Sequence, residues 1–327
     1  MNIRMDAHIP TITESGSPTI VVHSSASNGN NSPTDQGCLR NPCNIASSAY
    51  HFVLGRFRRT HVNEHVNGRM LDSKLLCYSG CFVLKQETWE LPEGRKIYVR
   101  KCLNNRAGKK LLINDKKMLR AAQGPNIVPF IETKDKSLLM PFAGEPLICI
   151  LARDQDRGLP RPKFESYAQQ LMQGVAHLHH SGIWHLDLKL ANVLVDESGE
   201  DKLTIIDFGL SQRAGRAKNK DPGTMGYKSP EMICRGHKAL SAKTDIFAAG
   251  VILFELLTNY RLFPQSINFL NKGFVAKEDS YYEYLNSRLQ LVEDIDNHYA
   301  QLIRSMLVWN PKDRPDADKV LGDLLRY

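Results

Sequence analysis

Apolar residues are spaced differently in two successive parts of the chain. Between about Leu71 and Phe142 the spacing favours short strands with one helix. The strand patterns cover Leu75–Leu84, Lys96–Leu103 and Leu138–Met140, and the helical pattern covers Leu111–Ala122. This part of the chain therefore predicts a small, strand-rich lobe.

From about Ala143 onward the apolar spacing is mainly helical. The clearest helical patterns cover Phe164–His180, Thr244–Leu257 and Tyr299–Leu307. Inside this part, the runs Val193–Val195 and Leu203–Ile206 flank the polar stretch DESGE and predict two short strands joined by a hairpin-like turn. The order of elements predicts an α+β protein, with a small β-rich lobe followed by a larger helical lobe.

The beginning of the chain shows no sustained periodicity. It is rich in Ser, Asn, Thr, Pro and Gly, as in SSASNGNNSPTD, and cannot bury enough apolar surface to fold alone. We interpret residues 1–48 as a disordered tail. Residues 49–142 are then an N-terminal extension with the first lobe, and residues 143–327 form the second lobe.

Composition narrows the classes of protein that fit. Lys and Arg number 43 against 35 Asp and Glu, a net charge of +8, but the basic residues are scattered and nucleic-acid binding is not expected. No apolar run approaches the roughly 20 residues that cross a bilayer, so we expect no membrane span. The seven cysteines form no regular framework, which indicates a reducing compartment, the cytoplasm or the nucleus. We expect a monomer.

Four polar side chains lie around the two short strands of the second part. Asp187, Lys189 and Asn192 precede the first strand in GIWHLDLKLANVL, and Asp207 follows the second in TIIDFG. A carboxylate can orient an acceptor hydroxyl and take its proton while an ammonium screens phosphoryl oxygens, which suits Asp187 and Lys189. Carboxylate and amide oxygens suit Mg²⁺, which fits Asp207 and Asn192. The pattern predicts phosphoryl transfer.

The motif H-x-D-L-K-x-x-N followed by D-F-G resembles the signature of eukaryotic protein kinases. Ser229-Pro230-Glu231, the D-x-F-x-x-G that begins at Asp245, and Arg314 match further motifs of that family in order. In the family Glu231 pairs with Arg314, and Asp245 braces the catalytic loop. The G-T-x-x-Y form at Gly223–Tyr227, together with Lys189, is similar to serine/threonine kinases and not to tyrosine kinases. The resemblance implies a bilobal protein-kinase fold, ATP and Mg²⁺ as cofactors, and protein substrates.

The resemblance also implies a lysine on a strand of the first lobe that reaches the ATP phosphates. Lys101 and Arg100 are both candidates, on the strand IYVRKCL. Strand alternation puts Lys101 on one face with Ile97, Val99 and Leu103, an apolar surface fit to cover a nucleotide base. Arg100 falls on the other, more solvated face. We therefore predict Lys101 as the nucleotide lysine, and Val99 as a residue that contacts the nucleotide.

The acidic partner of this lysine in the family is a glutamate on the following helix. The matching residue here is Asp115, one methylene shorter, which requires a closer helix or a bridging water. The other interpretation of Asp115 is an exposed helix charge.

The glycine-rich loop of the family matches Tyr78–Val83, which keeps only Gly80 and the aromatic Phe82. Glycines let the backbone approach the phosphates, so their loss predicts weaker ATP binding or a distorted loop. At the other end of the site, Met140–Ala143 resembles the gatekeeper and hinge that contact adenine, with Met140 and Ala143 as contacts. Glu145 either meets the ribose or is a surface carboxylate.

Leu186 stands where most switchable kinases have an arginine that binds an activation-loop phosphate. The loop from Asp207 to Thr224 contains Ser211 as its one other hydroxyl. We therefore expect activity without activation-loop phosphorylation. The basic residues near this loop predict an acidic or already phosphorylated substrate, or else are merely solvated; they are Arg213, Arg216, Lys218, Lys220 and Lys228. Ala191 stands where basic-directed kinases often have a glutamate.

The leading hypothesis is an active serine/threonine kinase, because Lys101, Asp187, Asn192 and Asp207 are all present. The alternative is a pseudokinase that acts as a binding scaffold, which the glycine-poor loop and Asp115 favour. HLDLKxAN without the usual arginine is similar to Mos, the meiotic kinase that activates MAP-kinase kinases, which implies a role in the cell cycle. The form G-T-x-G-Y-K-S-P-E also resembles replication-initiation kinases.

Overall fold

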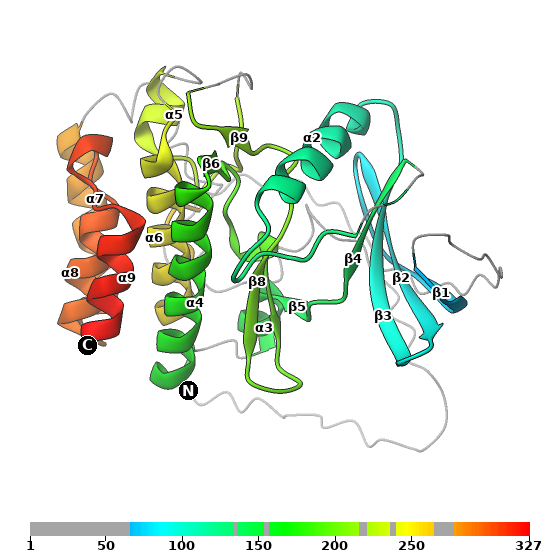
Figure 1. The fold of residues 1–327 in the computed structure, drawn as a ribbon. Helices are drawn as coiled ribbons and strands as arrows, with labels where there is room; N and C mark the ends of the chain where they lie inside the picture. Colours follow the sequence, from blue (N-terminus) through cyan, green and yellow to red (C-terminus); the bar gives the residue numbers. More distant parts are fainter. Residues whose placement is uncertain are drawn as a thin grey trace, which may run out of the picture. The chain divides into compact units, whose positions relative to one another are not determined.

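The protein is described here by a computed structural model over residues 66–131, 133, 136–153, 157–215, 221–235, 240–264 and 278–327. The tail predicted over residues 1–48 lies outside the described residues. All the described residues belong to one unit, which begins at Leu39. Within that unit a sheet lobe is followed by a larger helical lobe (Figure 1), so the predicted α+β architecture is confirmed.

The first lobe is built on a four-stranded antiparallel sheet in the order β1-β2-β3-β4. Its strands are β1 Arg69–Ser79, β2 Phe82–Leu91, β3 Gly94–Leu103 and β4 Ser137–Pro141. Ser79 pairs with Phe82, which leaves Gly80 and Cys81 as a two-residue turn. The single strand predicted over Leu75–Leu84 is therefore wrong. That segment is a hairpin, and its apolar run looked continuous because neither turn residue is charged.

β3 buries side chains on both of its faces. The prediction that one face is apolar and the other solvated is therefore wrong. Ile97, expected on the apolar face, is 42% exposed, whereas Arg100, expected to be solvated, is only 9% exposed. Arg100 Nε donates to Glu87 Oε1 at 2.7 Å, and Trp89 Nε1 donates to the other oxygen of Glu87 at 3.1 Å. The outer face of the sheet thus has its own small core, formed by Val66, Met70, Trp89, Tyr98 and Leu139.

The helix of the first lobe, α2 Gly108–Ala121, begins three residues before the predicted helix and packs against the sheet (Figure 1). Its buried side chains Leu112, Asp115 and Leu119 follow the spacing of one helical face. Asp115 therefore lies on the buried stripe of α2, facing β3, in place of an apolar residue.

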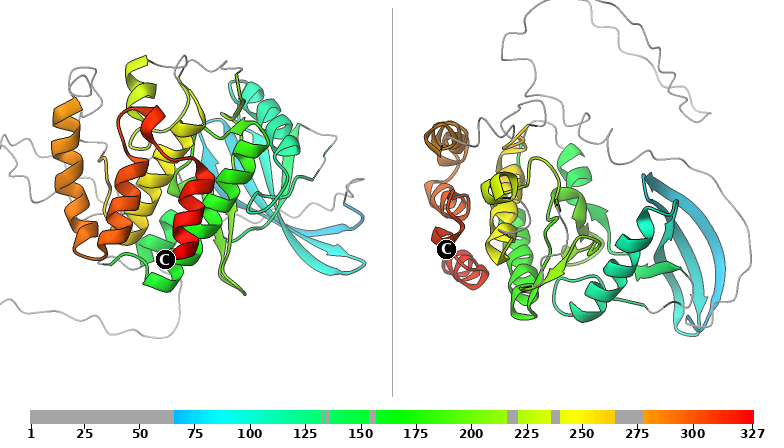
Figure 2. Two further views of the ribbon diagram at one scale, coloured as in Figure 1. Left: turned by 60° about the vertical axis from the view of Figure 1, so that its left-hand side comes forward. Right: turned by 90° about the horizontal axis from the view of Figure 1, so that it is seen from above.

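The second lobe is organised around α6 Ala242–Thr258, in which every residue from Thr244 to Thr258 is buried. A helix that is apolar on all sides needs cover all round, and α4 Arg161–His180, α7 Glu278–Glu293 and α8 Asn297–Met306 supply it. Seen from above, α7, α8 and α9 Ala317–Arg326 form a layer at the end of the molecule opposite the sheet (Figure 2). The described part of this lobe also contains the short helices α3 Leu147–Arg153 and α5 Pro230–Arg235.

The three predicted helices of this lobe are confirmed as α4, α6 and α8, whereas α3, α5, α7 and α9 were not predicted. No helix in the described part of the chain is long and apolar enough to cross a bilayer. The described residues of this lobe also include the 3₁₀ turns η1 Leu190–Asn192 and η3 Pro311–Asp313.

Two small sheets lie between the sheet lobe and α6. The predicted hairpin is confirmed as β7 Val193–Asp196 and β8 Lys202–Ile205, with β5 Glu145–Pro146 added beside β7. β6 Ile183–Trp184 pairs with β9 Gln212–Arg213. The segment with the candidate catalytic residues begins directly after β6 and ends at β7. These two strands therefore fix both of its ends.

Candidate active site

The candidate catalytic loop is held in a strained conformation by a buried aspartate of α6. Leu186 and Asp207 have φ angles of 65° and 66°. This left-handed region costs a residue with a side chain about 1–3 kcal/mol. Asp245 accepts the backbone N–H groups of His185 and Leu186, each at 2.8 Å. The predicted brace is therefore present, and it fixes the backbone that presents Asp187.

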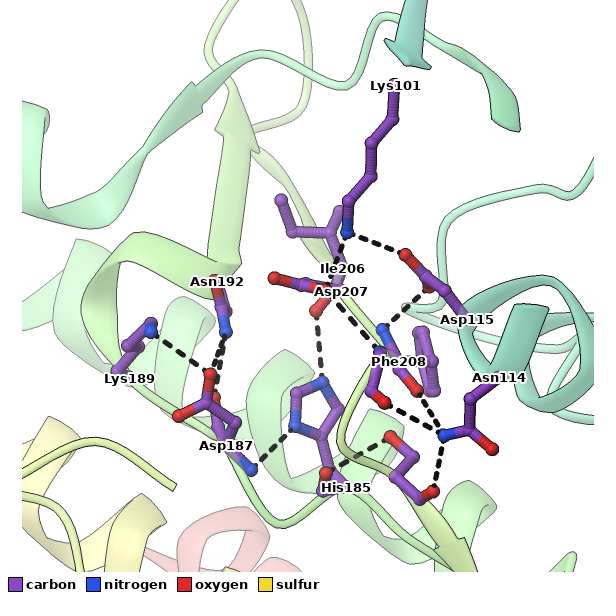
Figure 3. A network of polar contacts seen from close by, with 12 residues as sticks. Lys101, Asn114, Asp115, His185, Asp187, Lys189, Asn192, Ile206, Asp207 and Phe208 are labelled. Atoms are coloured by element: carbon purple, nitrogen blue, oxygen red, sulfur yellow. Dashed lines mark hydrogen bonds and ion pairs between the residues drawn. The ribbon is translucent and has the colours of Figure 1, made fainter. Parts of the chain in front are cut away.

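Asp187 lies at the centre of a cluster of donors (Figure 3). Its Oδ2 accepts hydrogen bonds from Lys189 Nζ at 3.0 Å and from Asn192 Nδ2 at 3.2 Å. Its Oδ1 accepts from the Thr224 hydroxyl at 2.7 Å, and Lys189 Nζ also donates to that hydroxyl oxygen at 2.8 Å. The three residues predicted from HLDLKLAN converge on one point, and Thr224 joins them, a contact that the sequence did not predict.

His185 supports this loop from the interior. Its ring is fully buried and packs edge-on against Phe208, with the ring centroids 5.0 Å apart. Its Nδ1 accepts the N–H of Asp187 at 3.3 Å, so its Nε2 is the protonated nitrogen and donates to the Ile206 carbonyl at 3.0 Å. These contacts give His185 a packing role beneath the catalytic loop.

Lys101 lies between two carboxylates. Its Nζ is 2.7 Å from Asp115 Oδ2 and 2.8 Å from Asp207 Oδ1 (Figure 3). Asp115 is 1% exposed, so its interpretation as an exposed helix charge is wrong. The shorter aspartate reaches Lys101 directly because it projects from the face of α2 that packs on the sheet.

Burial and ion pairing together set the protonation of this cluster. Burial disfavours a charged Asp207, but the Lys101 ammonium outweighs burial and lowers the pKa of Asp207 to about 2. Burial raises the pKa of Asp115, which shares the same ammonium. Burial also disfavours a charged Lys101, yet the two carboxylates outweigh it and raise the pKa of Lys101. Lys101 is therefore a cation at neutral pH, as phosphate binding requires.

The residues predicted to bind Mg²⁺ have oxygens to offer. Asn192 uses its Nδ2 to donate to the Asp187 carbonyl at 2.9 Å, which leaves its amide oxygen as the atom that can bind a cation. The side chain of Asp207 is 37% exposed, although one of its oxygens contacts Lys101. Among the described residues no cluster of three or more His, Cys, Asp or Glu side chains could hold a metal. A pair of oxygen ligands fits Mg²⁺, which keeps phosphate oxygens and waters as its other ligands.

A cavity of about 460 Å³ lies beside this cluster, a size that suits a small organic ligand. Its lining includes the predicted residues Val99, Met140, Ala143 and Glu145, and it is completed by apolar side chains such as Leu76. The side chain of Glu145 is 54% exposed and forms an ion pair with Arg153. It is thus a carboxylate at the rim, already paired with a cation.

Comparison with known families decides what this arrangement is. The protein kinase domain matches residues 91–324, well over half of the chain. The chain belongs to the protein kinase family. The predicted family and enzyme class, a protein kinase, are confirmed at this level. The match begins at the last residue of β2, so the β1–β2 turn lies outside it.

Curated relatives of this kinase domain are themselves kinases. The human hormonally up-regulated neu tumor-associated kinase is 28% identical over 286 residues, which cover 82% of this chain and 38% of that protein. Its homolog in Xenopus tropicalis is 28% identical over 298 residues, covering 85% of this chain and 40% of the relative. Homolog B of Xenopus laevis is 31% identical over 177 residues, covering 52% of this chain and 26% of the relative. The chain thus spans at most two fifths of the length of these relatives.

The activation segment of this kinase domain, from Asp207 to Glu231, is tied to the catalytic loop at Ser211, and residues that follow the segment pack on Leu186. Leu186 is 3% exposed and forms an apolar cluster with Met232, Leu240 and Trp184. Ser211 is fully buried, and its hydroxyl donates to the His185 carbonyl at 3.1 Å. A buried hydroxyl of this kind cannot be reached by another kinase without local unfolding.

The basic residues of this segment are not all available to a substrate. Lys228 is 8% exposed, and its Nζ is 2.5 Å from Asp221 Oδ1, so its charge is paired. Arg213 is exposed on β9. The other predicted basic residues of the loop, Arg216, Lys218 and Lys220, lie outside the described residues.

The β1–β2 turn differs from the loop that the family resemblance predicted. Neither Gly80 nor Phe82 lines the cavity. A Cβ added at Gly80 would meet nothing within 4 Å, and the φ angle of Gly80 is not positive, so this position does not require glycine. Phe82 is 7% exposed and its ring covers the Lys101 ammonium at 4.4 Å from the centroid. The positions of the two residues do not test whether they contact ATP, and their role as a glycine-rich loop stays a prediction.

Asn114 is a residue of the site that the sequence reasoning missed. From α2, its Nδ2 donates to the carbonyls of Gly209 and Ser211, each at 2.9 Å (Figure 3). The neighbouring Asp115 accepts the N–H of Phe208 at 2.9 Å. Asn114 comes just before the predicted ion-pair residue, but nothing in the local sequence indicates contacts with a segment 95 residues away.

Proposed function

We propose that this protein is a serine/threonine protein kinase that transfers the γ-phosphate of ATP to a hydroxyl group of a protein. The observation that supports this best is the cluster around Asp187. One oxygen of Asp187 already accepts a bond from a hydroxyl, that of Thr224, at 2.7 Å, and the other accepts from an ammonium. A serine or threonine acceptor needs a bond of the first kind to be oriented and to lose its proton.

Each side chain of the site has its own role in the proposed phosphate transfer. Asp187 orients the acceptor hydroxyl and takes its proton, and Lys189 balances negative charge beside it. Lys101 supplies a cation for the phosphates, with Asp115 holding the lysine in place. Asp207 and Asn192 would hold Mg²⁺, which neutralises phosphate charge when it is bound.

The deciding experiment compares phosphate transfer by the wild type and by Asp187→Asn, with Mg-ATP and a mixed protein substrate. The variant keeps the size of the side chain but loses the base, and we expect a loss of about 10²–10⁴-fold. The control is Asp196→Asn, because the carboxylate of Asp196 only accepts bonds from Ser198 on a turn away from the site. Equal transfer by wild type and Asp187→Asn would refute the proposed activity.

We also propose that the enzyme works without phosphorylation of its activation segment. The support is twofold: Leu186 offers an apolar side chain where a phosphate would need a cation, and Ser211 is buried. Enzyme treated with phosphatase should keep its turnover rate. A rate that falls after this treatment and returns on phosphorylation of the segment would contradict this mode of control.

For the substrate, we propose an acidic or already phosphorylated protein. Glu255, 2% exposed, is the buried carboxylate next to Tyr227 of the activation segment, and it is engaged by the Tyr227 hydroxyl at 2.6 Å and by Arg261 at 3.1 Å. It is therefore not free to bind a basic substrate residue, whereas Arg213 is exposed. A peptide library should favour Asp, Glu or phosphoserine near the acceptor. A preference for arginine before the acceptor would contradict this proposal.

A second candidate function is a pseudokinase scaffold, and the contact of Phe82 with Lys101 is the observation that favours it.

The resemblance to Mos, the replication-initiation alternative and a role in the cell cycle stay predictions, as does the monomeric state. A reducing compartment, cytoplasm or nucleus, is a further proposal, supported by the free thiols of Cys77, Cys81 and Cys149.

A further inference from the structure

The Lys101 ammonium has three N–H donors, and two carboxylates and an aromatic ring lie around it. Two carboxylates, those of Asp115 and Asp207, lie at 2.7 and 2.8 Å. The face of the Phe82 ring covers a further side, with its centroid 4.4 Å from Nζ, well within the range of a cation–π contact. The lysine side chain is in consequence only 8% exposed.

The β1–β2 turn that carries Phe82 is fastened to the connection between β3 and α2 and lies against the first residue of α2. Asn105 Nδ2 donates to the Gly80 carbonyl at 2.8 Å, and the backbone N–H of Asn104 donates to the Cys81 carbonyl at 2.8 Å. Gly108 lies so close beneath the turn that an added Cβ would be 2.9 Å from the Cys81 oxygen and 3.1 Å from the Phe82 ring. These contacts hold the ring over the ammonium.

The 460 Å³ cavity is lined without Phe82. A ligand that needs only the apolar cavity, such as an adenine nucleoside, does not have to move the ring. A nucleotide that brings phosphates to Lys101 has to displace either the ring or a carboxylate. The free-energy cost of binding at this site is therefore higher for a nucleotide than for a nucleoside.

We propose that Phe82 is a specificity-determining residue that disfavours the phosphates of a nucleotide by capping Lys101, so that ATP binds only when the β1–β2 turn moves the ring away. This inference rests on the proposed function, because it takes the cavity and Lys101 as the ATP site. It accounts for a turn that contains a single glycine, Gly80. The turn packs an aromatic ring against the lysine and does not need a bare backbone that follows the phosphates.

The test is calorimetric binding of Mg-ATP and of adenosine to the full chain, for wild type and variants. Phe82→Leu keeps most of the buried volume but removes the aromatic face, and should tighten Mg-ATP binding about tenfold. Adenosine binding should change less than about twofold. Asn105→Ala releases the turn without touching the cavity, and should tighten Mg-ATP binding by a smaller factor, about threefold. The matched control is Val83→Ala on the same strand, which should leave both affinities unchanged.

Two outcomes would overturn the inference: an unchanged ratio of the two affinities in Phe82→Leu, or Mg-ATP binding that weakens while adenosine binding holds. Thermal unfolding of each variant checks that the fold is retained. Turnover separates this inference from the proposed function. Tighter Mg-ATP binding by Phe82→Leu with no transfer by any protein supports the cap and refutes the enzyme. Transfer by the wild type with an unchanged affinity ratio refutes only the cap.

Discussion

The catalytic loop and the β1–β2 turn lie on either side of the Lys101 cluster, and they are held in different ways. The catalytic loop is fixed by a dense set of hydrogen bonds, in which Asp187 alone contacts Lys189, Asn192 and Thr224. The β1–β2 turn is fixed by two asparagines and by the packing of one aromatic ring. The first region matches the family motif and the second lies outside the family match. The catalytic loop has to hold several side chains in a fixed geometry, so its sequence tolerates little change. The β1–β2 turn only covers the site and can do so through a different contact.

The largest loss of stability is expected at the buried ion pair of Arg314 and Glu231. Arg314 donates to both oxygens of Glu231, at 2.8 and 2.7 Å, and the two residues are 2% and 5% exposed. Arg314→Ala leaves the Glu231 carboxylate buried without its partner, and should lower the free energy of unfolding by about 3–5 kcal/mol. Denaturant unfolding measures this. Arg69→Ala breaks the exposed pair with Glu90 and is the control, expected to lose less than about 1 kcal/mol. Similar losses in the two variants would mean that burial does not decide the strength of these pairs.

A smaller loss of stability is expected when Leu186 is replaced by arginine, the residue that most switchable kinases have at this position. Leu186→Arg places a guanidinium in the apolar cluster of Met232, Leu240 and Trp184, and should cost about 2–3 kcal/mol of stability. Leu186→Met conserves the volume and should cost less than about 1.5 kcal/mol. Thermal and denaturant unfolding compare the two. If Leu186→Arg is as stable as the wild type and gains dependence on a phosphate, the apolar packing described for this loop is incidental.

The smallest effects on stability distinguish two glycines, Gly80 in the β1–β2 turn and Gly108 in α2 beneath that turn. Alanine is normally the better helix former by about 1 kcal/mol, yet Gly108→Ala should destabilise by about 1–2 kcal/mol, because its Cβ would lie 2.9 Å from the Cys81 oxygen. Gly80→Ala should change stability by less than about 0.5 kcal/mol, because nothing lies within 4 Å of the added carbon. Equal stability of the two variants would show that the turn is not docked on α2.

Contacts between residues close together in the chain could be predicted from the sequence, whereas several contacts between distant residues could not. Asp187, Lys189 and Asn192 lie within six residues, so their spacing alone indicated one cluster, and the β7–β8 hairpin brought Asp207 to it. Lys101 was chosen correctly as the residue between the carboxylates, but on the false premise that the face of Arg100 is solvated. The partner of Arg100 on that face, Glu87, is 13 residues away across a strand pair that the sequence did not reveal.

The roles of Phe82 and Asn114 could not be predicted for the same reason. Each depends on where α2 docks, which is a property of the packed lobe and not of any short stretch of sequence. The prediction that Phe82 contacts the phosphates rested on residue types and did not include the two-residue turn that precedes Phe82. Helices α3, α5, α7 and α9 were not predicted. The two shortest, α3 and α5, have seven and six residues, so their apolar spacing gives little helical signal.

The paired contacts of Asn114 and Asp115 have a consequence for ligands that prefer one shape of the kinase over another. These adjacent residues hold Phe208, Gly209 and Ser211 from one face of α2. A rotation of the Asp207-Phe208-Gly209 segment must therefore break bonds to the helix, and a swing of the helix must break bonds to the segment. The two movements share one equilibrium, so an inhibitor that selects a rotated segment binds more weakly by the free energy of the bonds it breaks, and the displaced helix is the measurable sign that it has bound.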